Sequence, residues 1–104
     1  MASSALTNTR KIETLKAVRW TAHALLNLRE REIDRIEADK TIVNPTYSVP
    51  DPPGREIRMR RYFDADLQQE MLLRIVVEEA ENETVVVTLY KTSQIDRYLR
   101  GMVP

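Results

Sequence analysis

The sequence predicts an α+β fold, with helices in its first half and strands in its second. Capping residues precede apolar residues at helical spacing over residues 22–31 and 35–42, which indicates two helices. Two apolar, β-branched runs, 71–79 and 84–90, flank the polar segment 80–83 and predict a β-hairpin. We therefore expect N-terminal helices packed on a three- to four-stranded antiparallel sheet, followed by a short C-terminal helix.

Length and composition set the broad class of the protein. The 104 residues suffice for one compact domain, which we place at residues 14–104 after a flexible leader over 1–13. Sixteen Lys and Arg balance sixteen Asp and Glu, so the chain as a whole lacks the basic excess of a nucleic-acid-binding protein. There is no cysteine, and no apolar run is long enough to cross a membrane. We expect a cytoplasmic protein that has no membrane partner.

The start of the domain allows two interpretations. Residues 14–20 read as a short strand, but Ile12, Leu15 and Arg19 have the spacing of a helix over residues 9–20. The helices that follow have clearer starts. Thr21 is a candidate N-cap of the first.

The second helix has its own start and stop signals. Asp34 is a candidate N-cap, and Glu37 three residues later completes a capping-box pattern. The helix should end before Asn44-Pro45, because proline disfavours the helical conformation of the residue before it.

From residue 55 the pattern is that of β-structure. Residues 47–49 predict a brief strand and 50–54 a turn. Residues 55–63 alternate, so that two sets of side chains fall on opposite faces: Ile57, Met59 and Phe63 on one, and Arg58, Arg60 and Tyr62 on the other. A short helical turn is expected over 94–100.

His23, the only histidine, is the clearest candidate for proton transfer. A neutral imidazole can accept or deliver a proton near neutral pH, and Arg29 and Arg31 follow it on the same predicted helix. Guanidinium groups stabilise negative charge that develops on phosphate. A histidine bonded to a backbone carbonyl and an arginine paired with an acid are the structural alternatives.

The strand over residues 55–63 is the candidate phosphate-binding surface. Arg58 and Arg60 share a face with Tyr62, which would give single-stranded RNA basic groups beside an aromatic ring. A solvated strand face is the alternative interpretation. Lys91, after the last strand, could also reach a phosphate. Glutamates at the tip of the predicted hairpin do not indicate a metal site, and we expect neither a metal nor a cofactor.

Five segments in order carry a resemblance to a known family: Thr21-Ala22-His23-Ala24, Glu30-Arg31-Glu32-Ile33, Asn44-Pro45, Arg61-Tyr62-Phe63 and Val87-Thr88-Leu89-Tyr90-Lys91-Thr92. Their order and spacing resemble the domain-of-unknown-function family 4258, which looks related to the RelE/ParE-like toxin fold. The resemblance covers residues 14–100. It implies a ribonuclease-like fold in which a curved antiparallel sheet presents basic and polar groups to RNA.

If the chain cleaves RNA as some proteins of that wider fold do, it needs no metal. His23 would then be the general acid/base, while Arg31, Arg58, Arg60 and Lys91 would hold phosphate. Whether the chain is an enzyme stays open at this point. The rival is a non-catalytic protein-interaction or regulatory module, with an antitoxin-like protein as partner. A homodimer through a strand face carrying Val86 and Tyr90 is a further expectation.

Overall fold

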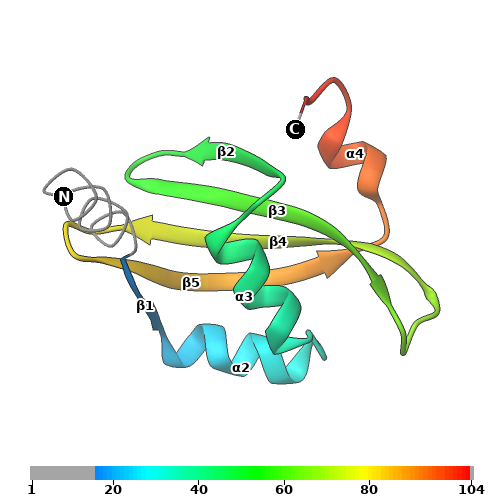
Figure 1. The fold of residues 1–104 in the computed structure, drawn as a ribbon, viewed down its shortest axis with the longest axis horizontal. Coiled ribbons are helices and arrows are strands. Elements are labelled where there is room, and N and C mark those ends of the chain that lie inside the picture. The colour runs from blue at the N-terminus through cyan, green and yellow to red at the C-terminus, as the bar shows by residue number, and fades with distance from the viewer. Residues whose placement is uncertain (1–15, 104) are drawn as a thin grey trace, which may run out of the picture.

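The computed structural model describes residues 16–103, and the predicted leader over residues 1–13 lies outside them. Elements follow one another in this order: β1 (Ala17–Trp20), α2 (Ala22–Glu30), α3 (Arg35–Val43), β2 (Tyr47–Asp51), β3 (Arg55–Asp64), β4 (Gln69–Glu79), β5 (Glu83–Thr92) and α4 (Ile95–Leu99). Residues 17–20 are therefore strand, while residues 9–15 of the competing helix are not among the described ones. Figure 1 shows α2 and α3 on one side of the sheet.

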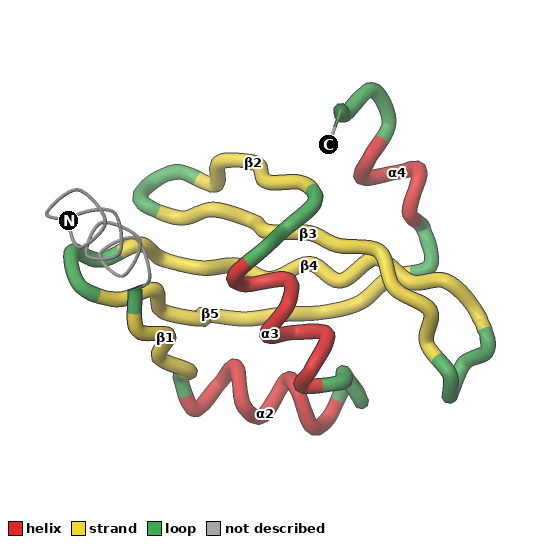
Figure 2. Tube along the Cα trace, in the orientation of Figure 1, coloured by secondary structure: helices red, strands yellow, loops and turns green. Residues whose placement is uncertain are grey.

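The predicted antiparallel sheet of three to four strands is wrong. The described residues form a five-stranded sheet in the order β1-β5-β4-β3-β2, and β1 runs parallel to β5. The helices α2 and α3 are not N-terminal either, because β1 precedes them. A four-residue strand at a sheet edge carries too short a pattern to reveal its pairing, and its partner lies more than sixty residues away. Figure 2 shows β1 beside β5 at one edge of the sheet.

The two helices begin at the residues that the sequence predicts. The side chain of Thr21 accepts a hydrogen bond from the backbone N–H of Ala24, and that of Asp34 accepts one from Ile36. Thr21 also donates its hydroxyl to the carbonyl of Val86, which ties the start of α2 to β5. Glu37 is engaged elsewhere, in an ion pair with Arg60.

The hydrophobic core lies between the sheet and the two helices α2 and α3. The helices and the turn between them contribute small and aliphatic side chains, and the strands contribute larger ones: Ala24, Ile33, Ala38 and Ile42 meet Tyr62, Met71, Leu73, Ile75, Val77, Val86 and Leu89. Strand β4 is buried on both faces over residues 71–77, which is typical of a central strand. No helix of the described residues is long and apolar enough to cross a membrane.

Strand β3 alternates as predicted, and its charged set faces α2 and α3. Arg58 pairs across with Ile75 and Arg60 with Leu73, whose side chains belong to the helix-covered core. Met59 pairs with Arg74 and therefore lies on the other face of the sheet, where it is also buried. Both faces of β3 thus contain buried groups, so alternation alone does not tell which face the helices cover.

A β-bulge in the last hairpin reverses the side-chain alternation of β5. Val86 pairs with Val77, but Thr88 pairs with Val76, so one extra residue of β5 lies between them. Val86 therefore faces the helices, whereas Tyr90 pairs with Arg74 and faces the opposite side. The predicted strand face carrying both residues does not exist in this structure.

Candidate functional site

His23 lies near the start of α2 with its side chain exposed to solvent. It lines none of the described cavities. Its side chain forms no hydrogen bond with another residue within 16–103. Arg31 caps the other end of α2, and eight residues of helix rise about 12 Å. The two predicted catalytic groups are therefore separated by the length of the helix.

Arg31 is bound to the sheet. Its Nη1 donates a hydrogen bond of 2.8 Å to the backbone carbonyl of Leu89 on β5. In this position the guanidinium group connects the C-terminal end of α2 to β5 through a backbone carbonyl, and it forms no salt bridge with an acid among residues 16–103.

Arg58 and Arg60 make ion pairs beneath α3. Arg60 Nη1 lies 2.5 Å from a carboxylate oxygen of Glu37 on α3. Arg58 pairs with Glu56 and Glu79, and it also donates to the carbonyl of Ile42 near the end of α3. The two arginines that the sequence offers to phosphate therefore hold α3 on the sheet.

Arg58 also lines a cavity of about 440 Å³ beside the C-terminal end of α3. Glu79 in this cavity accepts hydrogen bonds from Lys16, Arg58 and Thr84. Burial alone would raise the pKa of Glu79, but the hydrogen bonds from Thr84 and Lys16 and the charge of Arg58 lower it below its ordinary value. Two carboxylates and two cations thus leave the cavity with no excess of positive charge.

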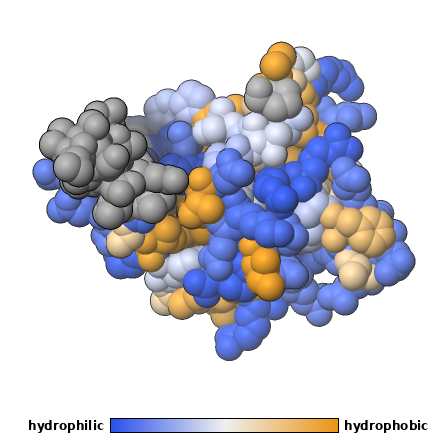
Figure 3. All heavy atoms as spheres, viewed as in Figure 1, coloured by the Kyte–Doolittle hydropathy of each residue, from blue (hydrophilic) through white to orange (hydrophobic). Residues whose placement is uncertain are grey.

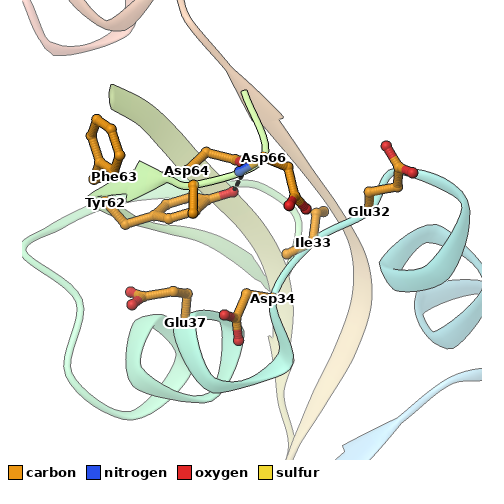
Figure 4. A pocket seen from close by; sticks show the side chains of 9 residues that line it. Glu32, Ile33, Asp34, Glu37, Tyr62, Phe63, Asp64 and Asp66 are labelled. Carbon is orange, nitrogen blue, oxygen red and sulfur yellow. Dashed lines mark hydrogen bonds between the residues drawn. The ribbon is translucent and has the colours of Figure 1, made fainter. Parts of the chain in front are cut away.

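Tyr62, Asp64 and Lys91 form a buried cluster at the other end of β3. Lys91 Nζ lies 2.6 Å from Asp64 Oδ2, and the hydroxyl of Tyr62 donates to the same oxygen at 3.2 Å. Lys91 Nζ also donates to the backbone carbonyl of Glu32. Figure 4 shows Tyr62 and Asp64 beside the turn that precedes α3.

The charges in this cluster stabilise one another. The hydrogen bond from Lys91 holds the pKa of Asp64 below its ordinary value against the opposing effect of burial. Burial, followed by the charge of Asp64, raises the pKa of Tyr62 above its ordinary value. Asp64 is therefore ionised and Tyr62 neutral near pH 7, and the ammonium group of Lys91 is already paired.

The cavity next to this cluster is acidic. It measures about 410 Å³, and most of its polar lining is carboxylate: Glu32, Asp34, Glu37, Asp64 and Asp66, together with Tyr62 and Phe63 (Figure 4). Carboxylates repel phosphate oxygens. Tyr62 thus lies next to negative charge, and its ring is largely buried.

The opposite face of the sheet carries arginines and tyrosines around α4. We call this surface the α4 face and define it by seven residues: Tyr47, Arg61, Arg74 and Tyr90 from β2 to β5, and Arg97, Tyr98 and Arg100 from α4 and its C-terminal end. A cavity of about 280 Å³ lies here between α4, Tyr47 and Arg61.

Arg74 is at the centre of the α4 face. Its guanidinium carbon lies 4.0 Å from the ring centroid of Tyr98 and 5.5 Å from that of Tyr90. Its side chain is buried and forms no salt bridge with any residue in 16–103. Of the four arginines on this face, Arg61 alone pairs with a carboxylate of the described residues, that of Glu70.

The sequence contains a signal for Arg74 that motif reasoning missed. It is the single charged residue in the run 71–77, which is otherwise apolar. A charged residue in a strand that is covered on both faces must be buried, and a buried cation needs a partner. Lys91, in contrast, lies on the helix-covered face of the sheet, where it pairs with Asp64.

The fold and the α4 face define an α+β domain with a mixed five-stranded sheet and an arginine-rich surface beside a short helix. The model of a known family, described as Domain of unknown function (DUF4258), matches residues 20–91, which is more than half of the chain. The chain belongs to this family. Neither the curated proteins nor the solved structures contain a match. The likeness to RelE/ParE toxins stays a prediction.

Proposed function

We propose that this domain binds single-stranded RNA through the α4 face and does not cleave it. One observation carries the proposal: Arg74, Arg97 and Arg100 have no carboxylate partner within residues 16–103, whereas Arg58, Arg60 and Lys91 all have one. Unpaired guanidinium groups beside tyrosine rings are the groups that hold phosphates and stack on bases in single-stranded RNA.

The position of His23 favours binding over cleavage. A general base must reach the 2′-hydroxyl directly or through one water. His23 belongs to α2, which packs on the helix-covered side of the sheet, so it cannot reach RNA that lies on the α4 face. The alternative, in which His23 and Arg31 act on RNA at the helix side, requires Arg58, Arg60 or Lys91 to leave its acidic partner.

RNA binding can be tested by titration of the full chain against labelled single-stranded RNA at two salt concentrations. We expect an affinity that falls with salt, because bound phosphates release counterions. The variant Arg97→Gln with Arg100→Gln should bind several-fold more weakly and show a smaller salt slope. Arg29→Gln is the matched control, since Arg29 is exposed on α2. Equal binding by the double variant and wild type would refute the proposal.

Cleavage is tested with the same RNA in the presence of EDTA. We expect intact RNA after incubation with wild type and with His23→Ala alike. Cleavage by wild type that His23→Ala abolishes would establish the catalytic alternative and place the site on the helix side.

A protein-interaction module is the second candidate, because α2 and α3 expose apolar side chains. Leu25, Leu26, Ile36 and Val43 have exposed fractions of 45%, 39%, 64% and 69%. Figure 3 shows hydrophobic patches among hydrophilic atoms on the side that carries these helices. Exposed apolar side chains of this kind favour a protein partner, such as the predicted antitoxin-like protein or a second copy.

The two candidates respond to different variants. Sedimentation velocity should detect self-association of wild type if a second copy covers these helices, and Ile36→Asn with Val43→Asn should abolish it. RNA binding should be unchanged in that variant. A monomer at high concentration would exclude the homodimer.

A further inference from the structure

Arg74 is a buried cation that pairs with no anion among residues 16–103. Its exposed fraction is 9%, and its Nε is fully buried without a hydrogen-bond partner. No carboxylate of residues 16–103 forms a salt bridge with it. Folded proteins rarely keep a buried charge unpaired, because removal of the charge from water is not repaid. This arrangement therefore favours any anion that can reach the guanidinium group.

Two tyrosine rings offset part of the free energy lost when this charge is removed from water. The rings of Tyr98 and Tyr90 lie within cation–π distance of Arg74. A second guanidinium group, that of Arg97, lies 5.7 Å from the ring centroid of Tyr98. Arg97 donates a hydrogen bond to the side-chain oxygen of Gln94, so it too has no carboxylate partner within the described residues.

The element that covers Arg74 is weakly held. Helix α4 has five residues, lacks a side-chain N-cap bond and buries none of its residues. A helix of this length has little stability of its own, and few packed contacts hold it on the sheet. Movement of α4 therefore costs much less than movement of α2 or α3.

We infer that Arg74 and Arg97 form a phosphate-binding site, and that Tyr98 covers Arg74 until a phosphate group takes its place. A phosphate suits two guanidinium groups better than a carboxylate does, because it carries more charge and more acceptor oxygens. The inference adds a phosphate-binding site to the proposed function. It rests on that function only in naming RNA as the source of the phosphate group.

The site can be tested with inorganic phosphate and the full chain. The ¹⁵N signal of Arg74 Nε should shift and saturate with phosphate, but not with chloride at equal ionic strength. Arg74→Lys should weaken phosphate binding at least tenfold, because an ammonium group lacks the bidentate fork. Arg29→Lys, on α2, should leave it unchanged. Equal affinity of wild type and Arg74→Lys, or no shift at Nε, would overturn the site.

The covering role of Tyr98 needs its own variants. Tyr98→Ala should raise the affinity for phosphate several-fold, because the ring no longer competes for the guanidinium group. Tyr98→Phe keeps the ring and should bind as wild type does. Weaker phosphate binding by Tyr98→Ala would show that Tyr98 itself contacts the phosphate. It would refute the inference that Tyr98 covers Arg74.

Two controls separate this inference from loss of fold and from the RNA proposal. Arg74→Met removes the unpaired charge, so its unfolding temperature in chloride should be no lower than that of wild type, while phosphate binding is lost. Phosphate binding at Arg74 without RNA binding would support the site and refute the RNA function. RNA binding unaffected by Arg74→Lys, together with no phosphate-induced shift at Arg74 Nε, would refute the site and leave that function in place.

Discussion

Asp64 illustrates how one charged side chain organises a region of the molecule. Its carboxylate accepts hydrogen bonds from Lys91 and Tyr62 and from the backbone N–H groups of Asp66 and Leu67. These bonds hold the turn between β3 and β4 and fix Lys91 against it. Lys91 in turn donates to the carbonyl of Glu32, which ties the segment before α3 to the same cluster.

We predict that Asp64→Asn lowers the free energy of unfolding by about 3 kcal/mol, because it leaves the buried ammonium group of Lys91 without a counter-charge. Urea denaturation measures this loss. Glu70→Gln is the matched control: it breaks the exposed Arg61–Glu70 pair and should cost about 1 kcal/mol or less. Equal losses in the two variants would contradict the assigned role of the cluster.

The lowered pKa of Asp64 also makes stability depend on pH. Its stabilisation is fully present above the unfolded pKa of about 4, and it is lost as pH falls through the lower pKa of the folded state. The difference in unfolding free energy between wild type and Asp64→Asn should therefore be constant from pH 7 to 5 and shrink below pH 4. A difference that is independent of pH would exclude an ionised Asp64.

At the scale of elements, local signals predicted the helices and the late hairpin but not the pairing of β1. The helices over residues 22–31 and 35–42 differ from α2 and α3 by one residue at one end each. Caps and turns depend on residues that are close together in the chain, so their signals can be recognised in a single sequence. The parallel partner of β1 and the face of β3 that α3 covers depend on distant residues.

Thr21 allows a prediction about the attachment of α2. Thr21→Ala removes both the N-cap bond to Ala24 and the bond to the carbonyl of Val86, so we expect a loss of about 2 kcal/mol in unfolding free energy. Thr21→Ser keeps the hydroxyl and should cost much less. Thermal unfolding of the two variants tests this, and equal stability of both would argue against the double role.

Across the whole molecule, zero net charge conceals a separation of charge. Carboxylates gather around the cavity next to Tyr62, whereas the α4 face has three arginines that pair with no carboxylate of residues 16–103. Predicted site residues such as Arg60 and Lys91 meet acidic partners that no local pattern identifies. The α4 face was missed for the same reason: its residues come from β2 to β5 and α4, and the register alone brings them together.

Local stability against unfolding should also differ between parts of the chain. Amide hydrogen exchange should be slowest in β4, which is buried over residues 71–77 and paired on both sides, and fastest in α4. Mass spectrometry of exchanged peptides gives this order. Protection of α4 equal to that of β4 would show that the helix is firmly held. It would also contradict the inference that Tyr98 moves away from Arg74 when phosphate binds.

The parallel pairing of β1 with β5 has a consequence for synthesis on the ribosome. Trp20 leaves the ribosome sixty-six residues before its partner Val86. At about 5–20 residues per second, β1 waits several seconds for the strand on which it docks. Completion of the sheet is therefore one of the last events in the formation of this domain, and a ribosome that stalls before β5 leaves the N-terminal strand exposed.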